Sequence, residues 1–393
     1  MEDVFIVGSK RTPIGAFLGA LSSVPATELG SIALKAALEQ AGVQPDQVDE
    51  LYFGNVLPAN LGQAPATQVA LGAGCPTTTP CTIINKVCAS GTKAIMVGSM
   101  SIRLGDAEIV AVGGMENMSR VPFYNPKGRT GNKYGNIELL DGLVRDGLQD
   151  VYSGAMMGEA GEQTAEKHGF TREQQDEYAI RAYNRAEEAA NAGKFDDEIT
   201  PVTIKTRKGE TVVEKDEEVE RVRYDKIPKL RPAFRKEGTI TAANASKLND
   251  GAAAMILASE SAVKKYNLKP LARVVSWADA ARDPMEFTVA PADALPIALK
   301  KADKSVADIG AFEINEAFSV VAMANQKLLE IDDDKLNVLG GAVSLGHPLG
   351  ASGTRITNTL ISALKDKNQQ YGAVGICNGG GGASALIIER VDD

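Results

Sequence analysis

The chain has 393 residues and a formal net charge of −9, with 44% apolar and 24% charged side chains. Its length predicts two to three domains, and its composition is globular, without an apolar run near the roughly 20 residues that a membrane-spanning helix needs. The acidic balance argues against nucleic acid and anionic lipid, so we expect no nucleic-acid partner and no membrane.

Along the first half, short apolar runs that favour strands alternate with amphipathic helical stretches. Strands are predicted over 4–7, 50–54 and 109–114, a helix over 31–41, and a helix start just after Cys88. Such alternation is typical of α/β sheets covered by helices.

The segment from about 119 to 246 breaks this alternation. It contains a glycine-rich loop over 125–135, a charged helical stretch over 171–192, and a basic island over 219–236 with seven basic residues against two acidic ones. On composition alone, the island is as readily a solvated face as a phosphate-binding surface. We interpret the whole segment as a lobe inserted over the first half.

The rest of the chain repeats the first part. The matched segments, at nearly constant spacing, are the two Ala-Ser-Gly-Thr motifs 89–92 and 351–354, the segments 33–54 and 298–315, and the strands 109–114 and 373–378. A second amphipathic helix is predicted over 354–365. This duplication predicts two similar α/β halves: residues 1–268, which include the inserted lobe, and residues 269–393.

The chain has four cysteines, too few for a disulfide framework, and Cys88 is the first candidate for chemistry. It precedes a predicted helix start, where the helix dipole stabilises a thiolate and backbone N–H groups face a developing oxyanion. Taken alone, a buried cysteine that packs as a small apolar residue is the commoner case. We keep that structural interpretation for Cys75 and Cys81.

Two further candidates lie in glycine-rich surroundings near the C-terminus. His347 lies in a Gly-His-Pro loop, where a titratable residue is a better candidate for chemistry than for packing, whereas His168 lies in a charged helical stretch and is predicted to be structural. Cys377 ends an apolar strand and opens a run of glycines. That run suits an oxyanion site, although a flexible turn is the alternative.

Five motifs, in one order along nearly the whole chain, resemble those of the thiolases. They are Asn-Lys-Val-Cys-Ala-Ser-Gly at 85–91, Gly-Gly-Met-Glu-Asn-Met-Ser at 113–119, Asn-Glu-Ala-Phe at 315–318, Gly-Gly-Ala-Val-Ser-Leu-Gly-His-Pro at 340–348 and Cys-Asn-Gly-Gly-Gly-Gly at 377–382. The resemblance implies two similar halves in a five-layered α-β-α-β-α arrangement, with a loop domain that covers coenzyme A.

The resemblance also implies a ping-pong condensation of two acetyl-CoA molecules to acetoacetyl-CoA and CoA, and the reverse thiolysis. Cys88 would be acetylated after His347 takes its proton, and Cys377 would be the acid and base of the second step. The N–H groups of Cys88 and Gly379 would form one oxyanion hole, and His347 and a water held by Asn315 the other. We expect the two thiols to occupy equivalent strand-to-loop positions of the two halves.

Ligand contacts follow from the same resemblance. The residues expected at coenzyme A are Tyr183, Arg221, Val222, Arg223, Lys226 and Ser246. No cofactor is required, but some relatives bind potassium, and the matching positions are Tyr183, Ala242, Ala243, Ala245 and Val343. One departure is Met156, where many short-chain thiolases have a histidine, so the range of acyl chains is open.

Several alternatives share part of this pattern. A 3-ketoacyl-CoA thiolase of broad chain length would keep every catalytic residue, whereas a decarboxylating ketosynthase would have a histidine in place of Cys377. A non-catalytic acyl-CoA-binding relative would lack one of the three reactive side chains. A nucleotide-binding dehydrogenase would need a spaced Gly-x-Gly-x-x-Gly, which the glycine run 379–382 lacks.

The resemblance further implies a homotetramer, a dimer of dimers, with the segment 124–134 as the tetramer contact. The first predicted strand follows Met1 almost at once, and the chain ends in Val391-Asp392-Asp393. We therefore expect a cytoplasmic protein, or a mitochondrial one if a presequence has been removed.

Overall fold

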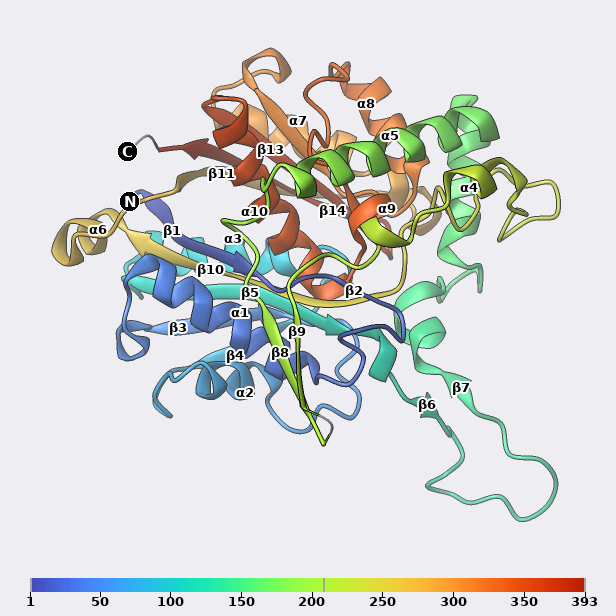
Figure 1. Ribbon diagram of the computed structural model, residues 1–393, viewed down its shortest axis with the longest axis horizontal. Coiled ribbons are helices and arrows are strands. Elements are labelled where there is room, and N and C mark those ends of the chain that lie inside the picture. The colour runs from blue at the N-terminus through green and yellow to red at the C-terminus, as the bar shows by residue number, and fades with distance from the viewer. Residues whose placement is uncertain (1, 208, 392–393) are drawn as a thin grey trace.

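A computed structural model describes residues 2–207 and 209–391, so Met1, Asp392 and Asp393, on which the targeting expectation partly rests, lie outside the described residues. Ten strands join into one sheet in the order β12-β13-β14-β11-β1-β10-β5-β3-β4, with β2 paired to β10 (Figure 1). These strands are β1 (Val4–Arg11), β2 (Gly15–Ala16), β3 (Glu50–Gly54), β4 (Cys81–Ile84), β5 (Ile109–Asn117), β10 (Asn249–Ser259), β11 (Ala272–Ala281), β12 (Ala311–Ile314), β13 (Tyr371–Asn378) and β14 (Gly382–Arg390).

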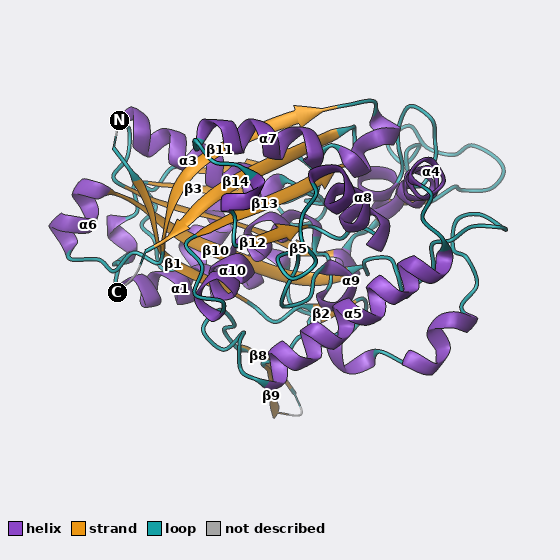
Figure 2. Cartoon of the chain, turned by 90° about the horizontal axis from the view of Figure 1, so that it is seen from above, coloured by secondary structure: helices purple, strands orange, loops and turns teal. Residues whose placement is uncertain are grey.

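Helices lie on both sides of the strands (Figure 2). They are α1 (Ala26–Ala41), α2 (Pro65–Gly72), α3 (Ser90–Leu104), α4 (Met157–His168), α5 (Arg172–Asn191), α6 (Glu260–Tyr266), α7 (Pro291–Lys301), α8 (Ser319–Leu329), α9 (Ala342–Leu345) and α10 (Leu349–Asp366). Within residues 2–207 and 209–391, no helix combines the length and the apolar character needed to cross a lipid bilayer.

The predicted five layers are present. Helix α1 packs on β1, β5 and β10 and carries α2 beside it, while α7 packs on β11, β13 and β14. Helices α3 and α10 pack against each other in the middle, where α3 contacts β3 and β5 and α10 contacts strands of both halves. These two central helices are therefore enclosed by the rest of the fold, and nearly every side chain along α10 is buried.

The strand pairing repeats between the halves. In the first half β3 runs parallel to β5, which is antiparallel to β10, which is antiparallel to β1; β12, β13, β14 and β11 repeat this pattern. In place of β4, the second half has a single parallel bridge between Phe312 and Leu336. This repetition supports our proposal of two duplicated halves, residues 1–268 and 269–393.

The two β layers are joined at one edge. Strands β1 and β11 pair antiparallel over Val4 to Ile6, so the half-sheets form one continuous hydrogen-bonded sheet. Both strands would otherwise be edge strands with unpaired backbone groups, and their pairing satisfies those groups.

The inserted lobe packs mainly on the second half, so our expectation that it lies over the first half was wrong for its helices. Helices α4 and α5 contact α8, and Ala160 and Ala165 of α4 share an apolar cluster with Phe318 and Val321. The hairpin of β8 (Val202–Thr206) and β9 (Gly209–Val213) rests on the first half's core, and Arg11 of β1 pairs with Glu198 and Asp216 of the lobe. The point of insertion did not determine which half the apolar helix faces would cover.

A long loop leaves the body of the molecule between two short strands of the lobe, β6 (Phe123–Tyr124) and β7 (Leu140–Asp141) (Figure 1). This loop contains the glycine-rich segment that was expected at 125–135. The apolar side chains Tyr134, Ile137 and Leu139 of this loop are exposed, and so is Phe123 of β6.

Candidate active site

Cys88 lies in a tight turn between β4 and α3. The preceding residue, Val87, has φ +48°, a left-handed conformation that is strained for a β-branched side chain. Ser90, the first residue of α3, holds this turn: its Oγ accepts from the Lys86 N–H at 2.8 Å and donates to the Val87 carbonyl at 2.6 Å. The predicted position of Cys88 just before a helix is therefore confirmed.

His347 lies in a corresponding turn before α10. Its backbone N–H donates to Asn249 Oδ1 at 2.9 Å, and Gly346 before it has φ +114°, where an added Cβ would lie 2.6 Å from the Asn249 side chain. The His347 Nδ1 lies 2.5 Å from Ser352 Oγ, which donates to the Pro348 carbonyl at 2.9 Å. Because that hydroxyl proton is already used, Nδ1 carries the imidazole proton and Nε2 keeps its lone pair.

The repeated Ala-Ser-Gly-Thr motif brings these two turns together. An added Cβ on Gly91 would lie 2.7 Å from the Thr354 nitrogen, and one on Gly353 would lie 2.3 Å from the Thr92 nitrogen. Only glycine at both positions lets the first turns of α3 and α10 approach so closely. The motif thus allows the two helices to cross closely. Its two serines, Ser90 and Ser352, stabilise the turns of Cys88 and His347 through hydrogen bonds.

This arrangement corrects our expectation that the two reactive cysteines occupy equivalent positions. Cys88 precedes α3, whose counterpart is α10, whereas Cys377 ends β13, whose counterpart is β5. The duplication therefore relates the turn of Cys88 to the turn of His347. Cys377 lies at the end of a strand and has no equivalent in Cys88.

Cys88 and Cys377 are buried and near each other. Burial raises the pKa of Cys88 to about 12, and a hydrogen bond from the Gly379 backbone N–H opposes that rise. Burial also raises the pKa of Cys377, and the nearby Cys88 adds to the rise. The position before a helix N-terminus, which we expected to stabilise the thiolate, therefore does not bring the pKa of Cys88 toward neutrality, because desolvation outweighs it.

Burial also keeps His347 neutral. It lowers the pKa of this residue to about 3, and the positive charge of Arg355 adds to the effect. The lone pair of His347 Nε2 is therefore available at neutral pH, and Asn315 Nδ2 lies 3.4 Å from it. Asn315 Oδ1 is buried and has no hydrogen-bond partner among the described residues.

Two buried glutamates of the motifs had no predicted role. Glu116 accepts hydrogen bonds from the backbone N–H groups of Val56, Leu57 and Gly350, so it ties the end of β3 to the first turn of α10. Burial raises its pKa to about 7. Glu316 binds the Val343 N–H at 3.0 Å and so holds the segment that leads to His347. Their positions inside the motifs were the only sequence signal.

A narrow cavity of about 130 Å³ reaches His347. Ser246, Met156 and Met157 line it, so the residue that departs from the thiolase pattern does face this space. An added Cβ on Gly379 would lie 3.5 Å from Met157 Sδ, which places the glycine run beside the same cavity.

A second cavity of about 230 Å³ contains most of the expected coenzyme A contacts. Tyr183, Arg221, Val222, Arg223 and Lys226 line it, and Ala242 and Ala243 lie there too. Arg223 and Lys226 are exposed, and Arg221 pairs with Glu217 at 3.1 Å. Lys247 lines both cavities, so they are neighbours along one path to His347.

The oxygen atoms expected to bind potassium do lie close together, but they surround the side chain of a lysine. Lys247 Nζ donates to Tyr183 Oη at 2.7 Å, to the Ala245 carbonyl at 2.9 Å and to the Val343 carbonyl at 3.1 Å. Tyr183 Oη in turn donates to the Ala243 carbonyl at 3.4 Å. With an ammonium at their centre, these residues do not fit a potassium ion.

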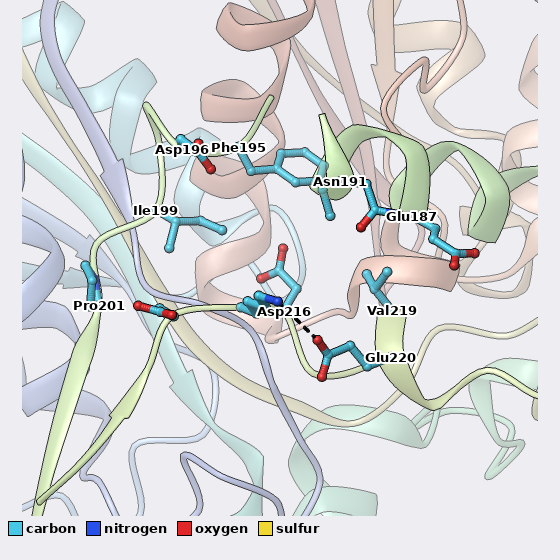
Figure 3. A pocket seen from close by; sticks show the side chains of 12 residues that line it. Glu187, Asn191, Phe195, Asp196, Ile199, Pro201, Asp216, Val219 and Glu220 are labelled. Atoms are coloured by element: carbon cyan, nitrogen blue, oxygen red, sulfur yellow. Dashed lines mark ion pairs between the residues drawn. The ribbon is translucent and has the colours of Figure 1, made fainter. Parts of the chain in front are cut away.

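A larger cavity of about 660 Å³ lies elsewhere, between the C-terminal part of α5 and the segments that flank the β8–β9 hairpin (Figure 3). Its charged side chains are mostly acidic: Glu187, Asp196, Glu214, Asp216 and Glu220, against Lys215. Such a lining repels phosphate groups, so this cavity does not suit coenzyme A.

The remaining cysteines and the second histidine lie in packed positions, and a structural role stays our prediction for them. Cys75 is buried in the core of the first half, and Cys81 packs against the same cluster. His168 ends α4 and stacks on Phe170.

Comparisons with known proteins show which family the chain belongs to. The family model "Thiolase, N-terminal domain" matches residues 4–261, and "Thiolase, C-terminal domain" matches residues 268–390. A probable acetyl-CoA acetyltransferase of Dictyostelium discoideum is 55% identical over 100% of this chain and 95% of its own length. A mitochondrial acetyl-CoA acetyltransferase of Rattus norvegicus is 53% identical over 100% of this chain and 92% of its own length. The Ascaris suum Acat5 thiolase, solved in complex with coenzyme A, superimposes with a TM-score of 0.94 at 45% identity, covering 99% of this chain and 100% of that one.

Proposed function

Because the chain belongs to the thiolase family, we propose that it is an acetyl-CoA acetyltransferase that condenses two acetyl-CoA molecules to acetoacetyl-CoA and CoA, and runs the reverse thiolysis. One observation carries the proposal: a buried thiol that faces a glycine N–H, a second buried thiol, and a neutral imidazole lie together beside a path to a basic cavity. That path suits a long thioester with phosphates at its far end.

In the first half-reaction, His347 Nε2 takes the Cys88 proton as the sulfur attacks the thioester carbonyl. Proton transfer and attack coincide, because burial disfavours a free thiolate. The N–H groups of Cys88 and Gly379 hold the tetrahedral oxyanion, and each such donor contributes about 3–4 kcal/mol in comparable sites. The C–S bond to CoA then breaks, CoA leaves with the proton, and acetyl-Cys88 remains.

In the second half-reaction, Cys377 passes its own proton to His347 Nε2 and, as a thiolate, removes a proton from the methyl group of a second acetyl-CoA. The enolate oxygen accepts hydrogen bonds from the His347 Nε2–H and from a water held by Asn315, whose buried Oδ1 has no partner among the described residues. The enolate carbon attacks acetyl-Cys88, the C–S bond breaks, and His347 returns its proton to the Cys88 sulfur, which leaves Cys377 as a thiol. Acetoacetyl-CoA and the free enzyme result.

Short acyl chains should react best, because the cavity at His347 is small and both methionines fill its wall. We expect thiolysis of acetoacetyl-CoA to exceed that of the 3-ketoacyl-CoA two carbons longer by roughly tenfold or more, since an ill-fitting methylene costs about 1–3 kcal/mol. Steady-state kcat/KM values for the two substrates test this. Equal values would favour the broad-chain 3-ketoacyl-CoA thiolase instead, with Met156 as the adaptable residue.

The basic cavity should bind the phosphates of coenzyme A. Replacing Arg223 and Lys226 together with alanine should raise KM for acetyl-CoA roughly tenfold and leave kcat nearly unchanged, because distant phosphate contacts bind substrate and transition state alike. Lys229→Ala/Arg231→Ala is the matched control: it removes the same charge from the basic island outside the cavity lining. If both double variants raise KM equally, general attraction rather than this cavity binds the phosphates.

We also propose a homotetramer in which the projecting loop between β6 and β7 contacts another subunit. Exposed apolar side chains on such a loop support an interface, since they are costly in water. Light scattering of the purified protein should give the mass of four chains, and Tyr134→Ser/Ile137→Ser should shift it toward two. A monomeric wild-type protein at micromolar concentration would exclude the assembly.

The cytoplasm stays our prediction for the compartment. A relative of 53% identity is mitochondrial, so the alternative location stays open to test by microscopy of the tagged full chain.

A further inference from the structure

Lys247 occupies an unusual position for a cation. Its Nζ binds the Ala245 carbonyl of its own loop before β10 and joins that loop to two remote segments: α5 through Tyr183 Oη and α9 through the Val343 carbonyl. An ammonium has three N–H donors and no acceptor, so these three oxygens satisfy it completely. Two of the three are main-chain carbonyls, the ligands that a bare monovalent cation also prefers.

We propose that the Lys247 ammonium is a built-in cation that takes the place of a bound monovalent metal ion, so that this enzyme neither needs nor binds potassium at the coenzyme A site. A potassium ion among the same oxygens would lie within contact distance of the ammonium, and two unit charges so close repel each other strongly. Burial lowers the pKa of Lys247 to about 8, and the negative charges of Glu218 and Glu316 oppose this shift, so the side chain stays mainly an ammonium at neutral pH.

The position of Lys247 links the two parts of the site that the proposed function uses. Lys247 lines both the cavity at His347 and the basic cavity. The residue before it, Ser246, lines the first cavity, and Val343 lies on α9, which ends directly before Gly346 and His347. Lys247 is therefore a positioning residue: it fixes the loop that contacts the thioester relative to the segment that carries the imidazole.

Two substitutions separate the charge from the space it fills. Lys247→Ser removes the ammonium and opens room among the oxygens, whereas Lys247→Met removes the charge but keeps a chain of similar length in the same space. Melting temperatures and KM for acetyl-CoA are measured for the full-length wild type and both variants in potassium, sodium and choline chloride at equal ionic strength.

We expect the wild type to give the same melting temperature and the same KM in all three salts. Lys247→Ser should melt lower and show a several-fold higher KM in sodium and choline, and potassium should restore part of both. Lys247→Met should show the same losses without a response to potassium, because its thioether still fills the site.

A wild type that potassium stabilises over sodium would overturn the proposal, and so would a Lys247→Ser variant that melts unchanged or ignores potassium. The wild-type comparison decides alone if Lys247→Ser does not fold. Melting does not depend on catalysis, so a wild type without acyl transfer would count against the proposed function and leave this comparison intact.

Discussion

Replacing Cys88 with alanine should reduce condensation and thiolysis by at least about 10⁴-fold, the size of loss that follows removal of a nucleophile. The reason is the turn that holds this thiol. It alone among the four cysteines pairs burial with a hydrogen bond from the Gly379 N–H, so an oxyanion formed at Cys88 meets a donor that is already in place. The measurement is transfer of radiolabel from acetyl-CoA to the protein, together with the steady-state rate.

Cys81→Ala is the matched control for this result. It makes the same chemical change at a cysteine that packs against the core of the first half, and it should keep both labelling and rate. The small side-chain change at Cys88 leaves the Ser90 hydrogen bonds of the turn intact, so loss of activity should come without loss of folding. Substantial labelling of Cys88→Ala would show that another residue accepts the acetyl group.

Replacing Cys377 with alanine should separate the two half-reactions. Acetyl-Cys88 should still form, because His347 and the Gly379 N–H remain. Exchange of the methyl protons of acetyl-CoA and condensation should fall by roughly 10²- to 10⁴-fold, the loss typical of a missing acid or base. Deuterium exchange followed by NMR and the yield of labelled protein after a single turnover measure the two effects.

Cys88→Ala, measured in the same two assays, is the internal control, since that variant should lose labelling as well as condensation. Cys377 lies in the apolar cluster that α4 shares with Phe318, so the variant's melting temperature is checked alongside. Normal condensation by Cys377→Ala would remove this thiol from the mechanism.

Regular elements with clear periodicity could be predicted from the sequence. The strand over 50–54 has the predicted bounds, and the charged helix appears as α5. Helix α10, however, begins at Leu349, five residues before its predicted start at 354. Its first turns contain Gly350 and Gly353, which disfavour a helix locally, and the hydrogen bond from the Gly350 N–H to Glu116 stabilises a start that only the fold supplies.

In the candidate site, too, the features with a local sequence signal could be predicted, and the features that depend on the fold could not. The motifs located Cys88, His347 and Cys377 because reactive residue types in glycine-rich turns leave a local signature. The protonation states did not follow from the motifs, because they depend on burial: the pKa of Cys88 is raised to about 12 and that of His347 is lowered to about 3. A helix N-terminus is a weaker influence than desolvation here.

Lys247 could not be predicted because its partners are remote in sequence. In the chain it is one more lysine, just after the end of the predicted inserted lobe, and its role depends on Tyr183 and Val343, which only the packed structure brings to it. The expectation of potassium rested on the residues that surround the site. It did not take into account the Lys247 side chain, which fills the site.

The most direct test of the account is to locate the acetyl group in the wild-type protein. The enzyme is mixed with acetyl-CoA, quenched in acid, digested, and its peptides are analysed by mass spectrometry. The account predicts one acetyl group on the peptide that contains Cys88 and none on the peptide that contains Cys377. An acetyl group on Cys377, or an unmodified Cys88 during turnover, would contradict it.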